Sequence, residues 1–556
     1  MTDAARTPLS IRDALLIVAV ALIFFLPGFQ SLPVIDRDEA RFAQASRQML
    51  DSGDLIDIRF QEEARHKKPV GIYWLQAGSA ALFGDTIASY RLPSLLGAVG
   101  AALMTGLIGA MLFGRTVGLT AGLLMAASFG LGYEARNAKT DAMLLFTVLV
   151  AQAALVRLYL RHPDQWERKH APYVFWAALG AGVLIKGPII VMVAGLTVLA
   201  LIVADRSVDR FKCLWNLKGV ALFALIALPW YIAITLKTDG AFFAEAVGKD
   251  LLGKVADGQE SHGAPPGTYL LTVWAFLWPG VALLGAGLPF LWANRGDDRV
   301  RFLLAWIVPS WVLFELTPTK LPHYTLPLFP ALMIAGAAGF EALADTGWTL
   351  WRRIAAGLSA GVALVLGIML AFAPLYARAS WPAGNEVPGN FVLSLVLLAA
   401  AAVAAYTLIK GWREWSGPRA LATLLAATFV LYGIGFGTVL PSLTPLWLSP
   451  RLEALIKAHT PRRCQSVEIA AVGYREPSLV FTLGKDITLT DARGAAQFLK
   501  DRASPCAFAL VDIRQRPEFG AVVLADQIPI EAVASLGGFN YSKGRAMEIG
   551  LYRLKP

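Results

Sequence analysis

Ionisable and aromatic residues that could do chemistry are concentrated in one polar stretch, residues 36–74, of an otherwise apolar N-terminal half. Acids stand near its start and cations near its end, and the candidates are Asp38, Glu39, Arg41, Lys67, Lys68 and Tyr73. This distribution beside apolar segments suits a site that handles an anionic, lipid-linked substrate. Basic residues next to a membrane also commonly contact lipid headgroups. The stretch by itself therefore leaves a catalytic interpretation and a solvated-loop interpretation equally open.

A second group of candidates interrupts the apolar segments further along the chain. These residues are Asp141, Lys186, Lys320, His323 and Tyr324. Asp141 precedes an apolar run and could simply pair with Arg136 or Lys139. Lys186 could reach lipid headgroups or bind a lipid phosphate. The turn that carries the last three candidates contains three prolines, which fix the backbone, so it suits either a ligand-holding turn or the start of a helix.

The composition indicates that these residues belong to a membrane protein. Hydrophobic residues make up 56% and charged residues 16% of the 556-residue chain, and the mean hydropathy is +0.55. Soluble domains carry roughly 25% charged residues, so the deficit indicates a polytopic membrane protein. The segment from Ala14 to Phe29 lacks a small-residue cleavage site, which predicts a retained first span rather than a signal peptide.

Apolar runs long enough to cross a bilayer divide the chain as far as residue 449. A spanning helix needs about 20 apolar residues, and the rule predicts thirteen spans: 13–29, 90–113, 116–133, 140–160, 172–187, 188–205, 218–237, 268–292, 300–316, 322–344, 354–376, 391–410 and 418–442. The two segments that meet at Lys186-Gly187-Pro188 could instead form one long helix. The apolar stretch Gly71–Gly84 is too short to span, so we expect it to lie in the membrane interface.

Basic residues are divided unevenly between alternate loops. One set of loops holds most of the Lys and Arg residues, including clusters within 157–169, 206–218 and 295–301. The positive-inside rule therefore places the N-terminus in the cytoplasm. With an odd number of spans, the loops 30–89 and 238–267 and the C-terminal region face the outer side. The cytoplasmic loops contain no phosphate-binding glycine loop, and the net charge of +10 follows from this topology, so we expect no nucleic-acid partner.

Local patterns in the first outer loop predict a helix that carries Asp38. Asp36 followed by Glu39 matches a capping box, which predicts a helix from there to about Leu50. Asp38, Arg41 and Phe42 would then share one face. Asp38 is not needed as the cap and is available for chemistry, although an acid at this position could also serve only to favour the positive end of the helix.

The residue pattern of the loop 238–267 predicts a helix over Phe242–Val255. The segment that follows, Asp257–Gly267, has no helical pattern and is typical of a mobile lid. A divalent metal could be held only by histidines that are scattered along the chain. They have no ligand spacing, so the sequence does not support a metal site. The residues that such a site would combine are His66, His262, His323 and Glu62.

From residue 450 the long apolar runs end and shorter strand and helix patterns follow. This change predicts a transmembrane domain, 1–449, followed by a soluble α/β domain, 450–556. The expected strands are 467–472, 506–513 and 546–553, with helices near 475–483 and 491–502. Cys464 and Cys506 both fall in this domain, where an oxidising compartment permits a disulfide. Their spacing does not show whether they meet. Cys213 falls in a cytoplasmic loop, where we expect a free thiol.

Four motifs taken together resemble the membrane glycosyltransferases of the C superfamily, which are related to the protein O-mannosyltransferases. Within them, the sequence is similar to the branch that transfers 4-amino-4-deoxy-L-arabinose (aminoarabinose) to lipid A. The resemblance covers the whole membrane part, but where members often have Glu-Lys-Pro this chain has Lys67-Lys68-Pro69. The motifs are Arg37-Asp38-Glu39-Ala40-Arg41-Phe42, Lys67-Lys68-Pro69 with Tyr73-Trp74, Lys186-Gly187-Pro188 and Lys320-Leu321-Pro322-His323-Tyr324.

The resemblance implies an inner-membrane enzyme that takes its sugar from undecaprenyl phosphate and modifies lipid A phosphates at the periplasmic face. Such a modification gives resistance to cationic peptides such as polymyxin. Arg41, Lys68 and Lys186 would stabilise the leaving lipid phosphate, and Asp38 and Asp141 would orient the sugar. We expect a monomer surrounded by membrane lipids.

Two alternatives remain at this point. Another polyprenyl-phosphate sugar could be the donor and a protein hydroxyl the acceptor, in which case Asp38 would be a general base. A transporter of lipid-linked sugars would instead place polar residues at the bilayer midplane and often show internal repeats. The charges here are concentrated at one face, and no repeat is evident, which favours catalysis at an interface.

Overall fold

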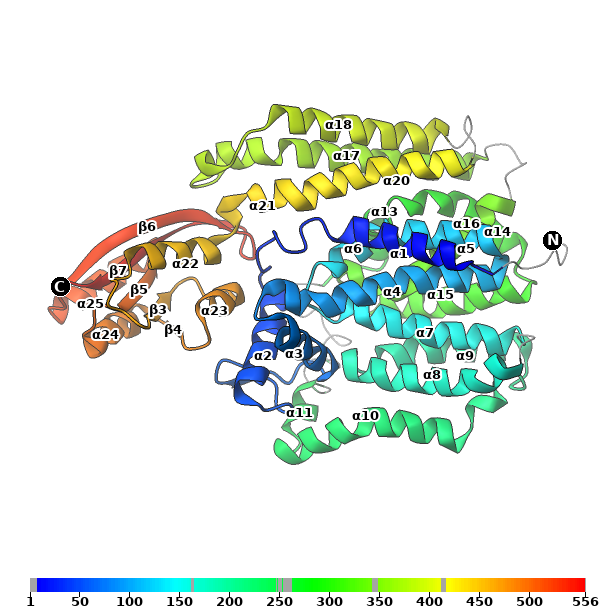
Figure 1. The fold of residues 1–556 in the computed structure, drawn as a ribbon, viewed down its shortest axis with the longest axis horizontal. Coiled ribbons are helices and arrows are strands. Elements are labelled where there is room, and N and C mark those ends of the chain that lie inside the picture. The colour runs from blue at the N-terminus through cyan, green and yellow to red at the C-terminus, as the bar shows by residue number, and fades with distance from the viewer. Residues whose placement is uncertain are drawn as a thin grey trace.

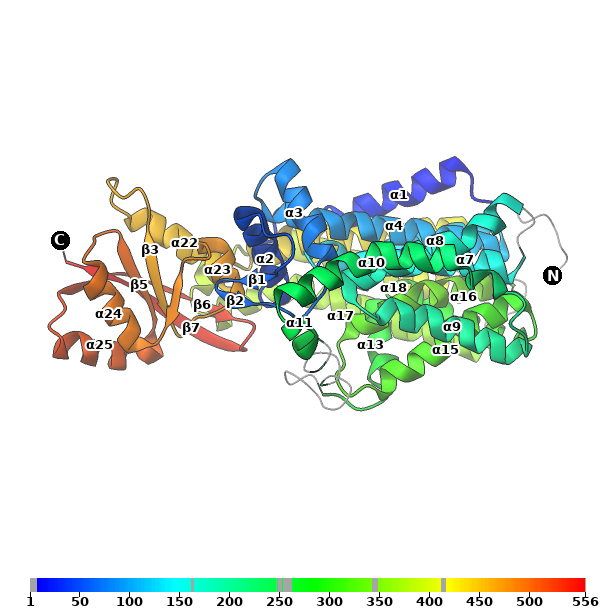
Figure 2. The ribbon, with the colours of Figure 1, turned by 90° about the horizontal axis from the view of Figure 1, so that it is seen from below.

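The computed structural model describes residues 8–161, 165–246, 248, 253, 263–342, 349–411 and 417–555. A large helical part and a smaller C-terminal part with a β-sheet lie end to end along the long axis of the molecule (Figure 1). The long helices run roughly along that axis. The short helices α2 (Asp38–Ser52), α3 (Gly71–Phe83) and α11 (Ala241–Phe243) lie between the two parts (Figure 2).

Each of the thirteen expected spans has a helical counterpart among the described residues. Seven of the described helices are long and apolar enough to cross a membrane, or nine if two bent pairs, α5–α6 (57°) and α13–α14 (118°), each count as one span. Four other counterparts are not among these: α1 and α9 are shorter, at 15 and 17 residues, and α8 and α15 have 22 and 19 residues but do not meet the combined limits on hydropathy and charge. The helices are α1 (Ile11–Phe25), α4 (Ile87–Phe113), α5 (Arg115–Ala126), α6 (Phe129–Ala135), α7 (Asp141–Tyr159), α8 (Gln165–Lys186), α9 (Ile189–Asp205), α10 (Leu217–Lys237), α13 (Thr268–Phe276), α14 (Leu284–Ala293), α15 (Asp298–Leu316), α16 (Phe329–Ala342), α17 (Leu350–Ser380), α18 (Phe391–Tyr406) and α20 (Gly417–Ile434).

The break after Lys186 separates two helices that fold back on each other. Gly187 has a φ of 74° between α8 and α9, a conformation that glycine adopts readily. A Cβ on Gly182 would lie 2.5 Å from a side-chain carbon of Ile190, so the two helices pack closely. The structure therefore decides the alternative that the sequence left open, and it places Lys186 at the end of a helical hairpin.

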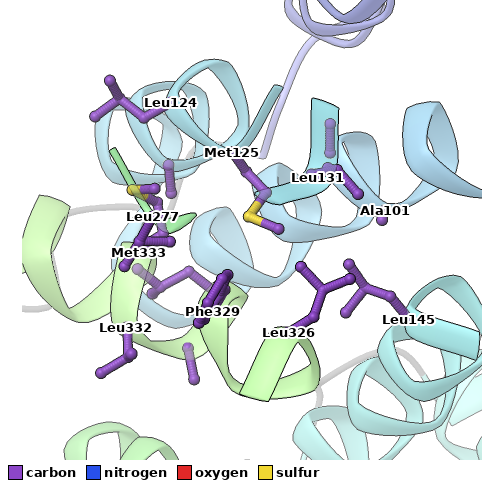
Figure 3. Close-up of a cluster of buried hydrophobic side chains, with 14 of the residues drawn as sticks. Ala101, Leu124, Met125, Leu131, Leu145, Leu277, Leu326, Phe329, Leu332 and Met333 are labelled. Atoms are coloured by element: carbon purple, nitrogen blue, oxygen red, sulfur yellow. The ribbon is translucent and has the colours of Figure 1, made fainter. Parts of the chain in front are cut away.

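A tightly packed apolar core holds the helices together. Leu124 and Met125 from α5, Leu145 from α7 and Phe329 and Met333 from α16 meet in its centre (Figure 3). Small residues allow close approach between neighbouring helices, as is usual in membranes. For example, a Cβ on Gly118 of α5 would lie 2.7 Å from the Cβ of Ala110 in α4. The core gives the segments that connect these helices a rigid support.

The loop 30–89 contains α2, a short hairpin of β1 (Arg59–Phe60) with β2 (Glu63–Ala64), and α3. The predicted capping box is wrong. Arg37 occupies the N-cap position of α2 without a side-chain hydrogen bond, because Asp36 and Glu39 are bonded to other parts of the fold. Helix α3 keeps large apolar side chains exposed, as suits a helix in a membrane interface; these are Trp74, Leu75, Leu82 and Phe83.

The C-terminal part begins with α22 (Leu448–His459) and contains a five-stranded mixed sheet of order β4-β3-β5-β7-β6. The three predicted strands are confirmed as β3 (Glu468–Val472), β5 (Ala507–Asp512) and β7 (Arg545–Leu554), and the two predicted helices as α23 (Pro477–Leu483) and α24 (Ala492–Arg502). The sequence did not predict α22, β4 (Thr488–Thr490), α25 (Arg516–Ala525) or β6 (Ile530–Asn540).

Cys464 and Cys506 form a disulfide, with Cα atoms 5.7 Å apart, and Cys213 is a free, exposed cysteine. The bridge closes a loop across a sequence separation of 42 residues.

We expect the double substitution Cys464→Ser/Cys506→Ser to destabilise the C-terminal domain by about 2–4 kcal/mol, since the unfolded chain gains entropy. Thermal unfolding with and without reductant measures this. Reductant should lower the midpoint of the wild type and leave that of the double variant unchanged.

Candidate active site

Two carboxylates and two lysines form a buried charge cluster where the helices end near the first outer loop. The Nζ atom of Lys139 lies 3.0 Å from Oε1 of Glu134, and Lys186 forms an ion pair with Asp141. His323 stands between the two pairs, with Nδ1 3.9 Å from Glu134 and Nε2 3.8 Å from Asp141. One histidine therefore lies beside both carboxylates.

Four separate segments supply this cluster. Glu134 is near the end of α6, Asp141 begins α7, Lys186 ends α8, and His323 belongs to the 3₁₀ helix η5 (Pro322–Leu328). Burial lowers the pKa of Lys139, but the Glu134 and Asp141 carboxylates outweigh it and raise the pKa on balance. Lys139 therefore stays cationic. Buried charges are tolerated when they are paired, and the pairing across four segments fixes their relative positions.

Asp38 approaches this cluster from α2 and differs from the other acids. Its side chain is exposed, and no hydrogen bond or ion pair to its carboxylate exists among the residues that the structure describes. The protein around the Asp38 carboxylate partly desolvates it, which raises the pKa of Asp38. The positive charges of Lys139, Arg65 and Arg41 outweigh this effect, so the pKa is lowered on balance. Asp38 is therefore an ionised, accessible carboxylate surrounded by cations.

Arg65 and Tyr73 add unsatisfied polar atoms beside Asp38. Among the residues that the structure describes, the buried Nε of Arg65 and the buried hydroxyl of Tyr73 have no hydrogen-bond partner of good geometry. The Arg65 guanidinium lies 5.0 Å from the ring centre of Phe42, and the Phe42 and Tyr73 rings are 5.2 Å apart. Because unpaired buried donors are costly, these groups favour a polar ligand at this position.

The remaining basic candidates differ in their surroundings. Lys67 is exposed, while Arg41 and Lys68 are half-buried on the same loop system. The Lys186 ammonium lies 5.6 Å from the ring centre of Tyr324. Lys320 is buried, and its Nζ donates to the carbonyls of Ala264 (3.0 Å) and Thr317 (2.6 Å). Lys320 therefore ties the end of the 238–267 loop to the proline-rich turn, and its contact with substrate stays a prediction.

No group of three or more His, Cys, Asp or Glu side chains that could hold a metal ion occurs among the described residues. The His66 side chain contacts Asp57, with Nε2 3.0 Å from Oδ1. The Glu62 side chain is exposed. His262 lies outside the described residues, as do seven of the fourteen residues of the predicted helical segment 242–255.

Comparison with known proteins links this arrangement to a group of enzymes. Residues 14–239 match the family described as dolichyl-phosphate-mannose-protein mannosyltransferase. The chain is 29% identical to the undecaprenyl phosphate-alpha-4-amino-4-deoxy-L-arabinose arabinosyl transferase of Pseudomonas aeruginosa (strain LESB58) over 521 residues, or 90% of this chain and 89% of that relative. It is 27% identical over 490 residues to the transferase of the same name from Aeromonas salmonicida, or 86% of each chain.

The fold matches that of a solved enzyme over nearly its full length. Crystal structures of ArnT from Cupriavidus metallidurans, in the apo state and bound to undecaprenyl phosphate, each give a TM-score of 0.72 with 97% of both chains covered, at 19% and 20% identity. The chain has the fold of the C-type membrane glycosyltransferases, and its similarity to named arabinosyl transferases indicates a glycosyltransferase that uses a polyprenyl-phosphate sugar. The resemblance expected from its sequence motifs is confirmed.

Glu39 of the glycosyltransferase is fully engaged in holding the site together. Its carboxylate accepts from Arg91 at 2.8 Å (Nε) and 2.9 Å (Nη2), and from the backbone N–H groups of Ile35 (2.7 Å) and Ala138 (2.9 Å). Glu39 and Arg91 are buried. Glu39 thus connects the start of α2 to the turn before Asp141, and we propose a positioning role for it in place of the predicted catalytic one.

Three residues of the glycosyltransferase site were not among the sequence candidates: Glu134, Lys139 and Arg65. Glu134 and Lys139 belong to the same polar interruption as Asp141, so their charge within an apolar region was a usable signal. Arg65 precedes Lys67 in a basic run, but only the fold shows that Arg65 is buried whereas Lys67 is exposed. Asp38, Asp141, Lys186, His323 and Tyr324 are brought together as a group.

Proposed function

We propose that this glycosyltransferase transfers aminoarabinose from undecaprenyl phosphate to phosphate groups of lipid A at the periplasmic face of the inner membrane. The modification would give resistance to cationic antimicrobial peptides such as polymyxin. One observation carries the proposal: the ionised Asp38 lies among Lys139, Arg65 and Arg41 in a chain similar over 90% of its length to an arabinosyl transferase named for this lipid-linked donor. The cations would bind the phosphate of the anionic carrier, and the Asp38 carboxylate would stabilise the positive charge that develops on the sugar.

The cations are suited to the leaving group. Cleavage of the bond between the anomeric carbon and the carrier phosphate leaves both bonding electrons on undecaprenyl phosphate. Fixed positive charges that face this oxygen stabilise it more in the transition state than in the ground state. Arg65, Arg41 and Lys186 are the candidates. Lys186 is paired with Asp141, but its side chain is 13% exposed, against 8% for the Lys139 side chain that pairs with Glu134.

Asp38 suits the developing charge on the sugar. A lipid A phosphate is already an anion, so it needs little deprotonation before its oxygen attacks the anomeric carbon. The Asp38 carboxylate would stabilise the positive charge at that carbon or bind the sugar amine. A single displacement of this kind inverts the anomeric configuration. Asp141 and His323, which lie 3.8 Å apart, would also help to orient the sugar.

Lys186→Ala is expected to lower kcat/KM for the lipid-linked donor roughly 10- to 100-fold, since a hydrogen bond to a charged group contributes about 1.5–3 kcal/mol. Initial rates at varied donor concentration measure the loss. Lys212→Ala is the matched control, because Lys212 is an exposed lysine, 66% accessible and paired with Asp209, outside the cluster. Unchanged kcat/KM in Lys186→Ala would remove this lysine from donor binding. The thermal midpoint is measured in parallel, since Asp141 loses its partner.

The proposed function is tested by reconstitution. Purified protein in a membrane vesicle is supplied with undecaprenyl-phosphate aminoarabinose and lipid A, and the acceptor is analysed by mass. A gain of one aminopentose on a lipid A phosphate supports the proposal. An unmodified acceptor with intact donor, from protein of normal thermal stability, rejects this donor and acceptor pair.

A second candidate is favoured by the mannosyltransferase family that matches residues 14–239. If the acceptor were a protein hydroxyl, Asp38 would act as general base, for which an ionised carboxylate is suitable. Supplying a polyprenyl-phosphate mannose and a serine- and threonine-containing protein in the same vesicles distinguishes the two. Sugar on the protein would support this alternative.

A further inference from the structure

The C-terminal domain contacts the membrane part at the segment that leads into α2. The Asp36 carboxylate accepts a hydrogen bond from the Ser478 backbone N–H (3.0 Å), and the Asp36 N–H donates to the Tyr541 hydroxyl (2.6 Å). The Arg37 guanidinium donates to the Ser542 carbonyl (2.8 Å). The two residues before Asp38 are therefore held by partners more than 400 positions further along the chain.

These partners are themselves fixed within the C-terminal domain. The Ser449 hydroxyl bonds both the Ser478 hydroxyl (2.6 Å) and the Tyr474 hydroxyl (3.0 Å). The Asn540 amide donates to Glu476 (2.9 Å) beside the hairpin turn between β6 and β7. Ser478, Ser449, Glu476 and Asn540 are all buried. A connected polar network of this kind gives a rigid surface, so the domain presents its bonding groups to Asp36 in a preset arrangement.

The backbone at Arg37 is strained. Its φ is 68° and its ψ is −109°, a region that non-glycine residues rarely adopt. Such conformations cost about 1–3 kcal/mol and persist only where the surroundings impose them. Here the neighbours on both sides are fixed, Asp36 by the C-terminal domain and Glu39 by Arg91. Arg37 is thus a strained link between two anchors, and Asp38 lies directly after it.

We propose that the C-terminal domain of this glycosyltransferase positions the Asp38 carboxylate, by holding Asp36 through Ser478 and Tyr541 and so imposing the strained backbone at Arg37. This assignment rests on the catalytic role proposed for Asp38. Asp36 and Tyr541 are positioning residues, since they act on Asp38 through the backbone. A displacement of about 1 Å in a reacting group can lower a rate about 100-fold. A small movement of Asp36, two residues before Asp38, is therefore expected to change the rate of transfer strongly.

The titration of Asp36 sets the conditions of the test. The pKa of Asp36 is raised to about 6, mainly by burial and also by the nearby Glu476 carboxylate. The hydrogen bond from Ser478 lowers the pKa but does not outweigh these two effects. Burial also raises the pKa values of Tyr474 and Tyr541, so both phenols stay neutral. All variants are therefore compared at one pH, 7.5, where Asp36 in the wild type is ionised.

Two variants in the full-length protein test the proposal. Tyr541→Phe removes the acceptor of the Asp36 N–H, and Asp36→Ala removes the acceptor of the Ser478 N–H. Each is expected to lower kcat at least 10-fold with the KM for the donor within twofold, because donor-binding groups are untouched. In both, amide hydrogen exchange in residues 34–41 should become faster. Tyr552→Phe is the matched control, since Tyr552 is a buried tyrosine of the same domain that packs on Phe519, and its kcat and exchange should stay unchanged.

The outcomes separate this inference from the proposed function. Unchanged hydrogen exchange in both variants rejects the anchor, and faster exchange with wild-type kcat rejects its effect on catalysis. A loss of kcat that Tyr552→Phe shares would also overturn the proposal, because it would reflect general damage to the domain. If the wild type transfers none of the offered sugars, the proposed function fails, while the exchange measurement still decides whether the domain holds this segment.

Discussion

Asp38→Asn is expected to lower kcat for sugar transfer by about 10²–10⁴-fold, the range typical for a positioned acid or base. The substitution keeps the size of the side chain but removes the negative charge that lies among Lys139, Arg65 and Arg41. Binding of the lipid-linked donor should be retained or become tighter, because the cations that face the carrier phosphate lose a competing charge. Transfer rates and donor binding are measured on the same preparation.

Asp51→Asn is the matched control for this prediction. Asp51 lies on the same helix, α2, and its side chain is exposed, so its substitution should change kcat by less than twofold. Normal transfer by Asp38→Asn would remove Asp38 from the mechanism. A loss of donor binding equal to the loss of rate would assign Asp38 to binding rather than to the chemical step.

The second large effect concerns stability. Arg91→Met should destabilise the protein by about 3–5 kcal/mol, the usual result when one partner of a buried ion pair is removed. Arg91 is fully buried, pairs with Glu39 at 2.8 Å, and donates to the carbonyls of Phe29 and Leu32 at 2.8 Å each. Arg91 also donates to the Pro33 carbonyl at 3.1 Å. The substitution therefore leaves the Glu39 charge buried and three backbone carbonyls without their donor. Thermal unfolding in one detergent, followed by tryptophan fluorescence, measures the change.

A charge-neutral double variant distinguishes this cause from a simple loss of packing. Arg91→Met/Glu39→Gln should be more stable than Arg91→Met alone, because it no longer buries an unpaired charge. Arg502→Met is the matched control: Arg502 pairs with Glu468 at 2.9 Å but both side chains are about half exposed, so the loss should stay below about 1 kcal/mol. Equal destabilisation by all three variants would contradict the account.

Much of the architecture follows from local sequence signals. Apolar runs of about 20 residues predict spanning helices wherever they occur, and each predicted span is helical. Short apolar runs likewise identify β3 and β5, which are buried along almost their whole length, and a partly alternating pattern identifies β7. The missed strand β6 (Ile530–Asn540) contains paired glycines and is half-buried along most of its length. Its strand character depends on pairing with β7, which is a property of the sheet and not of the segment.

The capping box shows where local patterns mislead. Asp36 and Glu39 have the spacing of a cap, and spacing is all that the sequence displays. In the fold, Asp36 bonds Ser478 across a sequence separation of 442 residues, and Glu39 bonds Arg91 across 52. Each of these contacts satisfies a buried polar group, and such a contact outweighs a solvent-exposed cap because an unsatisfied buried group costs more.

The sequence by itself determined the membrane class, the order of the helices, the motifs of the superfamily and the region of the site, because these depend on composition and on residues near one another. Only the tertiary structure decided which charges pair. It brought Glu134, Asp141, Lys186 and His323 together from four segments, fixed Glu39 as a support and left Asp38 accessible. Pairing of buried charges is set by desolvation and distance in three dimensions, and neither quantity is written in the order of the residues.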